Sequence, residues 1–92
     1  MDLSFDWHEE KALANLTKHG VSFEIAARVF LDPVRLDRYD GREDYDEDRF
    51  VTIGLVGNTE LAVAYTMRGD VIRIISARQA ARHEKHEYWK KH

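Results

Sequence analysis

The sequence has 92 residues, with 14 Lys and Arg against 17 Asp and Glu, which gives a formal net charge of −3 at pH 7. A chain of this length holds one modest core, so we expect a single domain over residues 1–92. The lack of Cys excludes a disulfide scaffold, a thiolate metal cluster and a cysteine nucleophile. No apolar run approaches the ~20 residues of a membrane span, and the N-terminus lacks a signal-peptide pattern. We therefore expect a cytoplasmic protein without membrane contact.

The charge is unevenly distributed along the chain. Residues 37–49 hold seven acidic and three basic side chains, whereas residues 65–92 hold seven Lys or Arg and three acidic side chains. Such asymmetry is more informative about partners than the total charge. The basic C-terminal third is therefore compatible with a nucleic-acid ligand.

The N-terminal third predicts a short strand and two helices. Asp6 followed by Glu9 fits a capping box, and Gly20 suits the left-handed position after a helix. Pro33 disfavours helical backbone at the residue before it and ends the second helix. These signals predict a strand over 3–7 and helices over about 8–19 and 23–31.

The rest of the chain predicts a meander of strands and a final helix. Apolar and polar residues alternate with a period of two, and Gly57-Asn58 is a tight-turn signal. The acidic segment 40–48 is expected to form a loop or an exposed ribbon. Ser76 followed by Gln79 fits a second capping box. The expected elements are strands over 34–39, 50–56, 61–65 and 71–75 and a helix over about 77–90.

These elements follow the order β-α-α-β-β-β-β-α. Because short turns join consecutive strands, we expect a mainly antiparallel sheet of four to five strands, with the helices packed to one side. The sequence therefore predicts an α+β fold with two N-terminal helices and one C-terminal helix.

The end of the first expected helix carries Lys18-His19, the first candidate for chemistry. Imidazole titrates near pH ~6.5 when unperturbed, so His19 can exchange a proton near neutrality. The alternative is that both cations only complement the helix dipole.

Three arginines near the C-terminal strand form the second candidate. Arg73 interrupts an apolar strand, on the face opposite Ile72 and Ile74, and needs a carboxylate partner or a phosphate there. Arg78 is expected in the first turn of a helix, and Arg68 in the loop before the strand over 71–75. Together they favour an anion site. A structural salt bridge explains Arg73 equally well.

The C-terminal helix also carries several His and Glu side chains. His83 and Glu87, spaced i, i+4, have a spacing that suits metal ligands, but no second ligand cluster accompanies them. A solvated helix face is the simpler interpretation, and we expect no metal and no cofactor.

Two motifs about fifty residues apart resemble the BrnT toxin family. The first is Lys18-His19-Gly20-Val21-Ser22-Phe23-Glu24, preceded by Trp7, Lys11 and Asn15. The second is Arg73-Ile74-Ile75-Ser76-Ala77-Arg78, preceded by Arg49, Gly54 and Tyr65-Thr66-x-Arg68-Gly69. The resemblance covers residues 5 to 88 and implies a toxin of a type II toxin–antitoxin system with a RelE-like ribonuclease fold.

The resemblance implies metal-independent RNA cleavage, in which the 2′-OH attacks the adjacent phosphate and translation is inhibited. His19 or Glu84 is then expected to transfer protons, and the three arginines to stabilise the transition state. The expected RNA-binding residues are Lys18, Arg49, Arg82 and Tyr88.

The same resemblance implies a BrnA-like antitoxin that neutralises the toxin, in a heterotetramer that reaches operator DNA only through the antitoxin. Two other functions stay open at this point. One is a catalytically inactive binding module that acts only as co-repressor with a DNA-binding antitoxin. The other is a small metal-binding or structural domain built on the His-rich helix.

Overall fold

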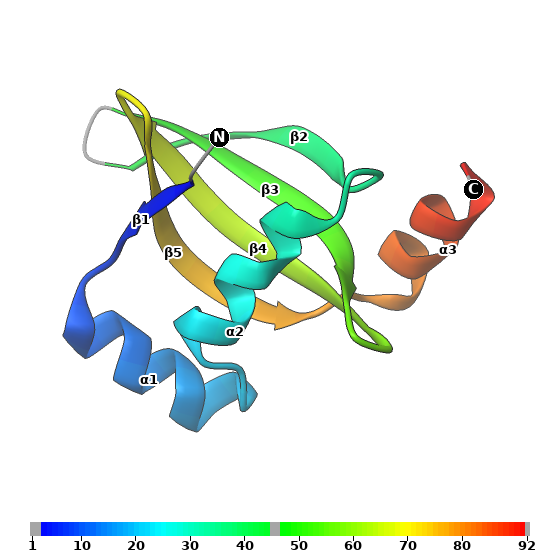
Figure 1. The fold of residues 1–92 in the computed structure, drawn as a ribbon, viewed down its shortest axis with the longest axis horizontal. Helices are drawn as coiled ribbons and strands as arrows, with labels where there is room; N and C mark the ends of the chain where they lie inside the picture. The colour runs from blue at the N-terminus through cyan, green and yellow to red at the C-terminus, as the bar shows by residue number, and fades with distance from the viewer. Residues whose placement is uncertain (1–2, 45–46, 92) are drawn as a thin grey trace.

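The computed structural model describes residues 3–44 and 47–91, which form three α-helices, a 3₁₀ turn and five strands (Figure 1). In chain order these are β1 (Ser4–Asp6), α1 (Glu9–His19), α2 (Phe23–Ala27), the 3₁₀ turn η1 (Arg28–Leu31), β2 (Leu36–Asp44), β3 (Glu47–Val56), β4 (Thr59–Arg68), β5 (Val71–Gln79) and α3 (Arg82–Lys90). The predicted order β-α-α-β-β-β-β-α is confirmed.

The strands form one mixed sheet in the order β1-β5-β4-β3-β2. Strands β2 to β5 are antiparallel neighbours, whereas the short β1 runs parallel to β5 at the edge. The Gly57-Asn58 turn joins β3 to β4, with Gly57 in the left-handed region at φ +61°. The predicted α+β class, with a mainly antiparallel sheet of five strands, is confirmed.

The two faces of the sheet carry separate hydrophobic clusters. On β4, Val63 and Tyr65 pack with α1, α2 and η1, while Ala62 faces the other way and packs with Tyr88 of α3. Alternate side chains along β4 therefore belong to the two different clusters. The expectation that all helices cover one side is wrong, because α3 lies on the face opposite α1 and α2. That face is only partly covered, and the candidate site runs beside β5, between this open part and α1.

The start of the C-terminal helix is the largest error of the sequence prediction. Residues 76–79 continue β5, because their backbone pairs with β4 from Ala64 to Leu61. Helix α3 begins at Arg82, and the Glu84 carboxylate accepts the Ala81 N–H at 2.7 Å. The predicted cap at Ser76 is therefore wrong, and the capping carboxylate is Glu84.

Smaller corrections concern the other ends. Helix α1 begins after His8, whose side chain makes no capping hydrogen bond, so the predicted Asp6–Glu9 capping box is wrong. The second helix tightens into a 3₁₀ turn at Arg28. The acidic segment adopts the ribbon alternative in its described part, where β2 runs to Asp44 and β3 starts at Glu47. Residues 45–46 lie outside the described residues.

No helix in the described ranges is long and apolar enough to cross a membrane.

Candidate RNA-binding groove

A β-bulge in β5 places Arg73 and Arg78 on the same face of the sheet. Residues five apart on a regular strand point to opposite faces. In β5, Ile74 pairs with Tyr65 and Ser76 with Ala64, so one extra residue, Ile75, is inserted. The insertion reverses the alternation after it, as bulges do. Arg78 therefore lies on the open face with Arg73, and it is a strand residue rather than the helix residue that the sequence predicted.

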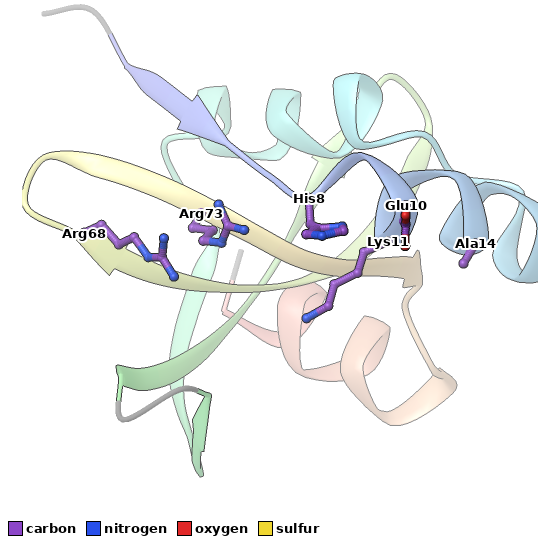
Figure 2. A pocket seen from close by; sticks show the side chains of 6 residues that line it. All are labelled: His8, Glu10, Lys11, Ala14, Arg68 and Arg73. Carbon is purple, nitrogen blue, oxygen red and sulfur yellow. The ribbon is translucent and has the colours of Figure 1, made fainter.

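Three hollows follow one another beside β5. The largest, of about 630 Å³, is lined by His8, Glu10, Lys11, Ala14, Arg68 and Arg73 (Figure 2). The second, of about 220 Å³, shares Lys11 and Ala14 with the first and adds Asn15, Lys18, His19, Ile75 and Ser76. The third, of about 100 Å³, shares Ser76 with the second and adds Asp40, Arg49, Val51, Ala62, Ala64 and Arg78. We call this chain of hollows the β5 groove.

Most of the predicted site residues line this groove, but at different positions along it. Arg68 and Arg73 line the first hollow, Lys18 and His19 the second, and Arg78 the third with Arg49. The three arginines predicted for one phosphate are therefore divided between the two ends of the groove. Small side chains on β4, Ala62 and Ala64, leave the space between the cations of the third hollow.

Each arginine of the groove is held by a carboxylate. Arg73 Nη1 lies 2.6 Å from Asp6 Oδ2 on the parallel edge strand, and Arg68 Nε lies 3.0 Å from Glu47 Oε2. Arg49 Nε lies 3.1 Å from Asp40 Oδ2, and Arg78 pairs with Glu84. The predicted salt-bridge alternative for Arg73 thus exists. The hydrogen-bonded pairs of Arg68, Arg73 and Arg78 fix their guanidinium groups in place while leaving other N–H donors for a ligand. The Nε atom of Arg49 is buried and makes no hydrogen bond within the described residues, although it lies close to Asp40.

Glu84 is the most constrained of these carboxylates. Its Oε1 and Oε2 atoms accept hydrogen bonds from Arg78 Nη1 and Nη2 at 2.7 and 3.0 Å, and the residue is only 6% exposed. The hydrogen bonds from Arg78 lower the pKa of Glu84, and they raise the pKa of Arg78. Glu84 is therefore a carboxylate at neutral pH that orients Arg78, a geometry unlike that of a proton donor.

Two other predicted RNA-binding residues lie away from the groove. Tyr88 is 3% exposed, and its hydroxyl donates a hydrogen bond of 2.6 Å to Asp32 Oδ2. Burial raises the pKa of Tyr88 to about 12, and the ring is not placed to stack on a base. Arg82 lies exposed in the first turn of α3, outside the residues that line the three hollows.

Asn15 ties α1 to the groove, a role that the sequence analysis missed. Its Nδ2 donates to the carbonyls of Val21 and Ala77 at 2.9 and 2.8 Å, and its Oδ1 accepts the Ala77 N–H at 3.0 Å. Strand β1 pairs only with residues 71–73 of β5, so Asn15 replaces a strand partner at Ala77. The polar stripe Lys11, Asn15 and Lys18, spaced i, i+4, i+7, was the sequence signal for this face of α1.

Within residues 3–44 and 47–91, no three His, Asp or Glu side chains are grouped so that they could hold a metal ion. Glu87, the predicted partner of His83 in a metal pair, forms an ion pair with Arg38 of β2. That contact ties α3 to the edge of the sheet.

Comparison with protein families matches residues 7–84 to the family described as “Ribonuclease toxin, BrnT, of type II toxin-antitoxin system”. Comparison with curated proteins gives no match. The matched range spans the elements from α1 to the start of α3, and it includes the described lining of the β5 groove. The chain therefore belongs to the BrnT family of ribonuclease toxins of type II toxin–antitoxin systems.

Proposed function

We propose that this protein is an endoribonuclease that binds single-stranded RNA along the β5 groove and cleaves it between the second and third hollows. The observation that carries this proposal is the adjacency of the three hollows, which share lining residues and together are lined by six of the predicted site residues. RNA presents one phosphate per nucleotide, so a line of cations along one strand suits its backbone.

The reacting phosphate is assigned to the junction at Ser76. The third hollow, of about 100 Å³, corresponds to about three water molecules, a size that suits a phosphate group rather than a nucleoside. Arg78 and Arg49 line it, and Lys18 and His19 line the adjacent hollow. Cations placed where negative charge develops stabilise a phosphorane-like transition state.

The reaction is an internal displacement at phosphorus. The 2′-oxygen forms a bond to phosphorus while the bond from phosphorus to the 5′-oxygen breaks. A base takes the 2′-OH proton, and the leaving 5′-oxygen gains a proton, so the products are a 2′,3′-cyclic phosphate and a 5′-OH end. His19 is assigned to proton transfer because it lines the second hollow and an imidazole can both accept and donate a proton.

Glu84 is assigned a positioning role in this mechanism. A carboxylate that accepts two hydrogen bonds from Arg78 and one from the Ala81 N–H holds the guanidinium toward the third hollow. Arg68 and Arg73 bind the RNA backbone further along the groove. The proposed reaction uses no metal, and cleavage is expected to persist in excess EDTA.

A type II toxin implies an antitoxin partner, and we propose a BrnA-like protein that neutralises the toxin in a heterotetramer. In that assembly the antitoxin, and not this chain, contacts operator DNA. Covering the β5 groove is the simplest way to block RNA. The antitoxin is therefore expected to compete with RNA for the purified toxin.

The test is cleavage of mixed-sequence RNA by the purified protein. Wild type should produce 2′,3′-cyclic phosphate ends, and RNA with 2′-O-methyl groups throughout should resist. His19→Ala and Arg78→Ala should each lower kcat by about 10²-fold or more, from the usual size of acid–base and charge-stabilising contributions. The matched controls are His86→Ala and Lys90→Ala on the exposed side of α3. RNA that stays intact with folded wild type would reject the nuclease and favour the inactive co-repressor.

A further inference from the structure

The first hollow of the β5 groove is larger than the reaction needs. Its volume of about 630 Å³ lies in the range of small-molecule sites, and it contains neither His19 nor Arg78. Its lining carries Lys11, Arg68 and Arg73 together with Glu10, and the two arginines are paired with Asp6 and Glu47, which are not among the lining residues. A hollow of this size and charge suits a nucleotide rather than an isolated phosphate.

We propose that this hollow is a subsite for one nucleotide of the RNA beyond the two that flank the cleaved bond, with Lys11 and His8 as its specific contacts. The proposal rests on the proposed function, because the RNA must pass through the second hollow to reach it. Neither residue was among the site residues predicted from the sequence. The subsite makes the enzyme prefer substrates long enough to fill it.

Lys11 is placed to bind the phosphate that joins the two positions. It lines both the first and the second hollow, so the residue lies where the two hollows meet. Figure 2 shows its side chain extending from α1 on the same side as the guanidinium groups of Arg68 and Arg73. A lysine at such a boundary contacts the backbone of the bound strand without touching the reacting atoms.

His8 provides a ring beside Lys11, at the start of α1. It precedes α1, is exposed and makes no capping hydrogen bond, so its ring is not committed to the helix end. His8 lines the hollow, and in the view of Figure 2 its imidazole appears between Arg73 and Lys11. Bases of single-stranded RNA commonly stack on aromatic and His rings. His8 is therefore assigned to the base, and the arginines to the phosphates.

The arginines of the subsite keep donors for RNA. Arg73 uses Nη1 for Asp6, and Arg68 uses Nε for Glu47. Each guanidinium has five N–H donors, so one carboxylate leaves others for phosphate oxygens. The partner carboxylates hold the two guanidinium groups, as Glu84 holds that of Arg78.

Substrate length separates this subsite from the reaction centre. The probes are mixed-sequence 2′-O-methyl RNAs of two, four and six nucleotides, whose binding is followed by fluorescence anisotropy. Unmodified RNAs of the same lengths, extended on the 5′ or the 3′ side, give kcat and KM. A phosphate contact to an ionised side chain is worth about tenfold to a hundredfold in affinity. Wild type should gain that factor when one nucleotide fills the hollow.

The Lys11→Ala and His8→Ala variants should lose that gain. Both should bind and cleave the dinucleotide like wild type, and their KM for the longer RNAs should rise by about tenfold with kcat unchanged. Lys90→Ala, which removes the same charge from exposed α3, is the matched control and should keep the gain. Thermal melting checks that each variant is folded.

Three results would overturn the subsite. One is wild-type affinity that does not change with length, and another is an equal effect of Lys11→Ala on short and long RNA. The third is a loss in Lys90→Ala of the same size. Failure of the nuclease proposal gives a different result. The affinity for RNA would then still rise with RNA length in a way that depends on Lys11, but unmodified RNA would stay uncut.

Discussion

Removing the Asn15 amide should uncouple α1 from β5 and lower both stability and turnover. The Asn15→Ala variant loses three hydrogen bonds of 2.8 to 3.0 Å at a position that is 7% exposed. It leaves the N–H and C=O of Ala77 and the C=O of Val21 without their partner. Each unsatisfied buried group costs about 1–3 kcal/mol, and entry of water offsets part of this. We expect a loss of about 2–4 kcal/mol, a large part of the roughly 5–15 kcal/mol of a small domain.

The catalytic effect should exceed what lower stability explains. Lys18 and His19 follow Asn15 by one helical turn, and Ala77 lies between Ser76 and Arg78, so Asn15 fixes the second hollow against the third. Displacement of the reacting groups lowers kcat strongly when geometry is lost. We expect kcat per folded molecule to fall by about 10²-fold, with KM changed much less.

Urea unfolding and single-substrate kinetics measure the two effects separately. Val63→Ala removes buried methyl groups from the core between the sheet and the helices, at a cost of about 1.5–3 kcal/mol, and leaves the contact between α1 and β5 intact. It is the control for stability alone, and Asn58→Ala in the exposed turn is the control for the substitution type. If Asn15→Ala and Val63→Ala have the same kcat per folded molecule, the positioning argument is refuted.

Other predictions concern Glu84, Gly54 and Tyr88. Because Arg78 lowers the pKa of Glu84 from 4.5, this pair adds stability above pH 4.5 that is lost as pH falls through the folded-state pKa. Urea titrations should therefore show Glu84→Gln less stable than wild type at pH 7, with a difference that shrinks toward pH 3; a constant difference contradicts the linkage. Gly54→Ala puts a Cβ 2.8 Å from a methyl carbon of η1 and should cost about 1–3 kcal/mol in thermal melts, whereas unchanged melting would disprove this close packing. Tyr88→Phe removes the hydroxyl that is hydrogen-bonded to Asp32, and it should lower the free energy of unfolding by about 1–2 kcal/mol without changing RNA affinity. Weaker RNA binding by the folded variant would show that Tyr88 contacts RNA.

Local patterns predicted the central sheet because each strand carries its own information. Large and small side chains alternate from Leu61 to Tyr65. The large side chains face α1, α2 and η1, whereas Ala62 faces α3. The turn at Gly57-Asn58 fixes the register of its two strands, since a two-residue connection leaves few alternatives. These signals depend only on residues that are neighbours in the sequence, so they predict the strands and the turn without knowledge of the fold.

The path of the chain from Ile75 to Ala81 depended on distant partners instead. Its alanines favour a helix in isolation, but helix propensity is a weak preference that tertiary pairing overrides. Here β4 supplies hydrogen bonds to residues 76–79, and Asn15 supplies further bonds at Ala77. The bulge at Ile75 has no sequence signature of its own. Because the bulge decides which face Arg78 occupies, the sequence could name the site's cations but not their arrangement along one groove.

The same arrangement explains how a chain with net charge −3 can offer a cationic surface to RNA. The carboxylates at Asp6, Glu47 and Glu84 each lie against a groove arginine, so they orient guanidinium groups within the site. An arginine held in this way has little side-chain entropy left to lose when RNA binds, and its remaining donors stay directed at the ligand. Net charge counts these acidic side chains against RNA binding, whereas their position makes them part of the proposed binding surface. The acidic total is therefore a poor guide to the ligand of this protein.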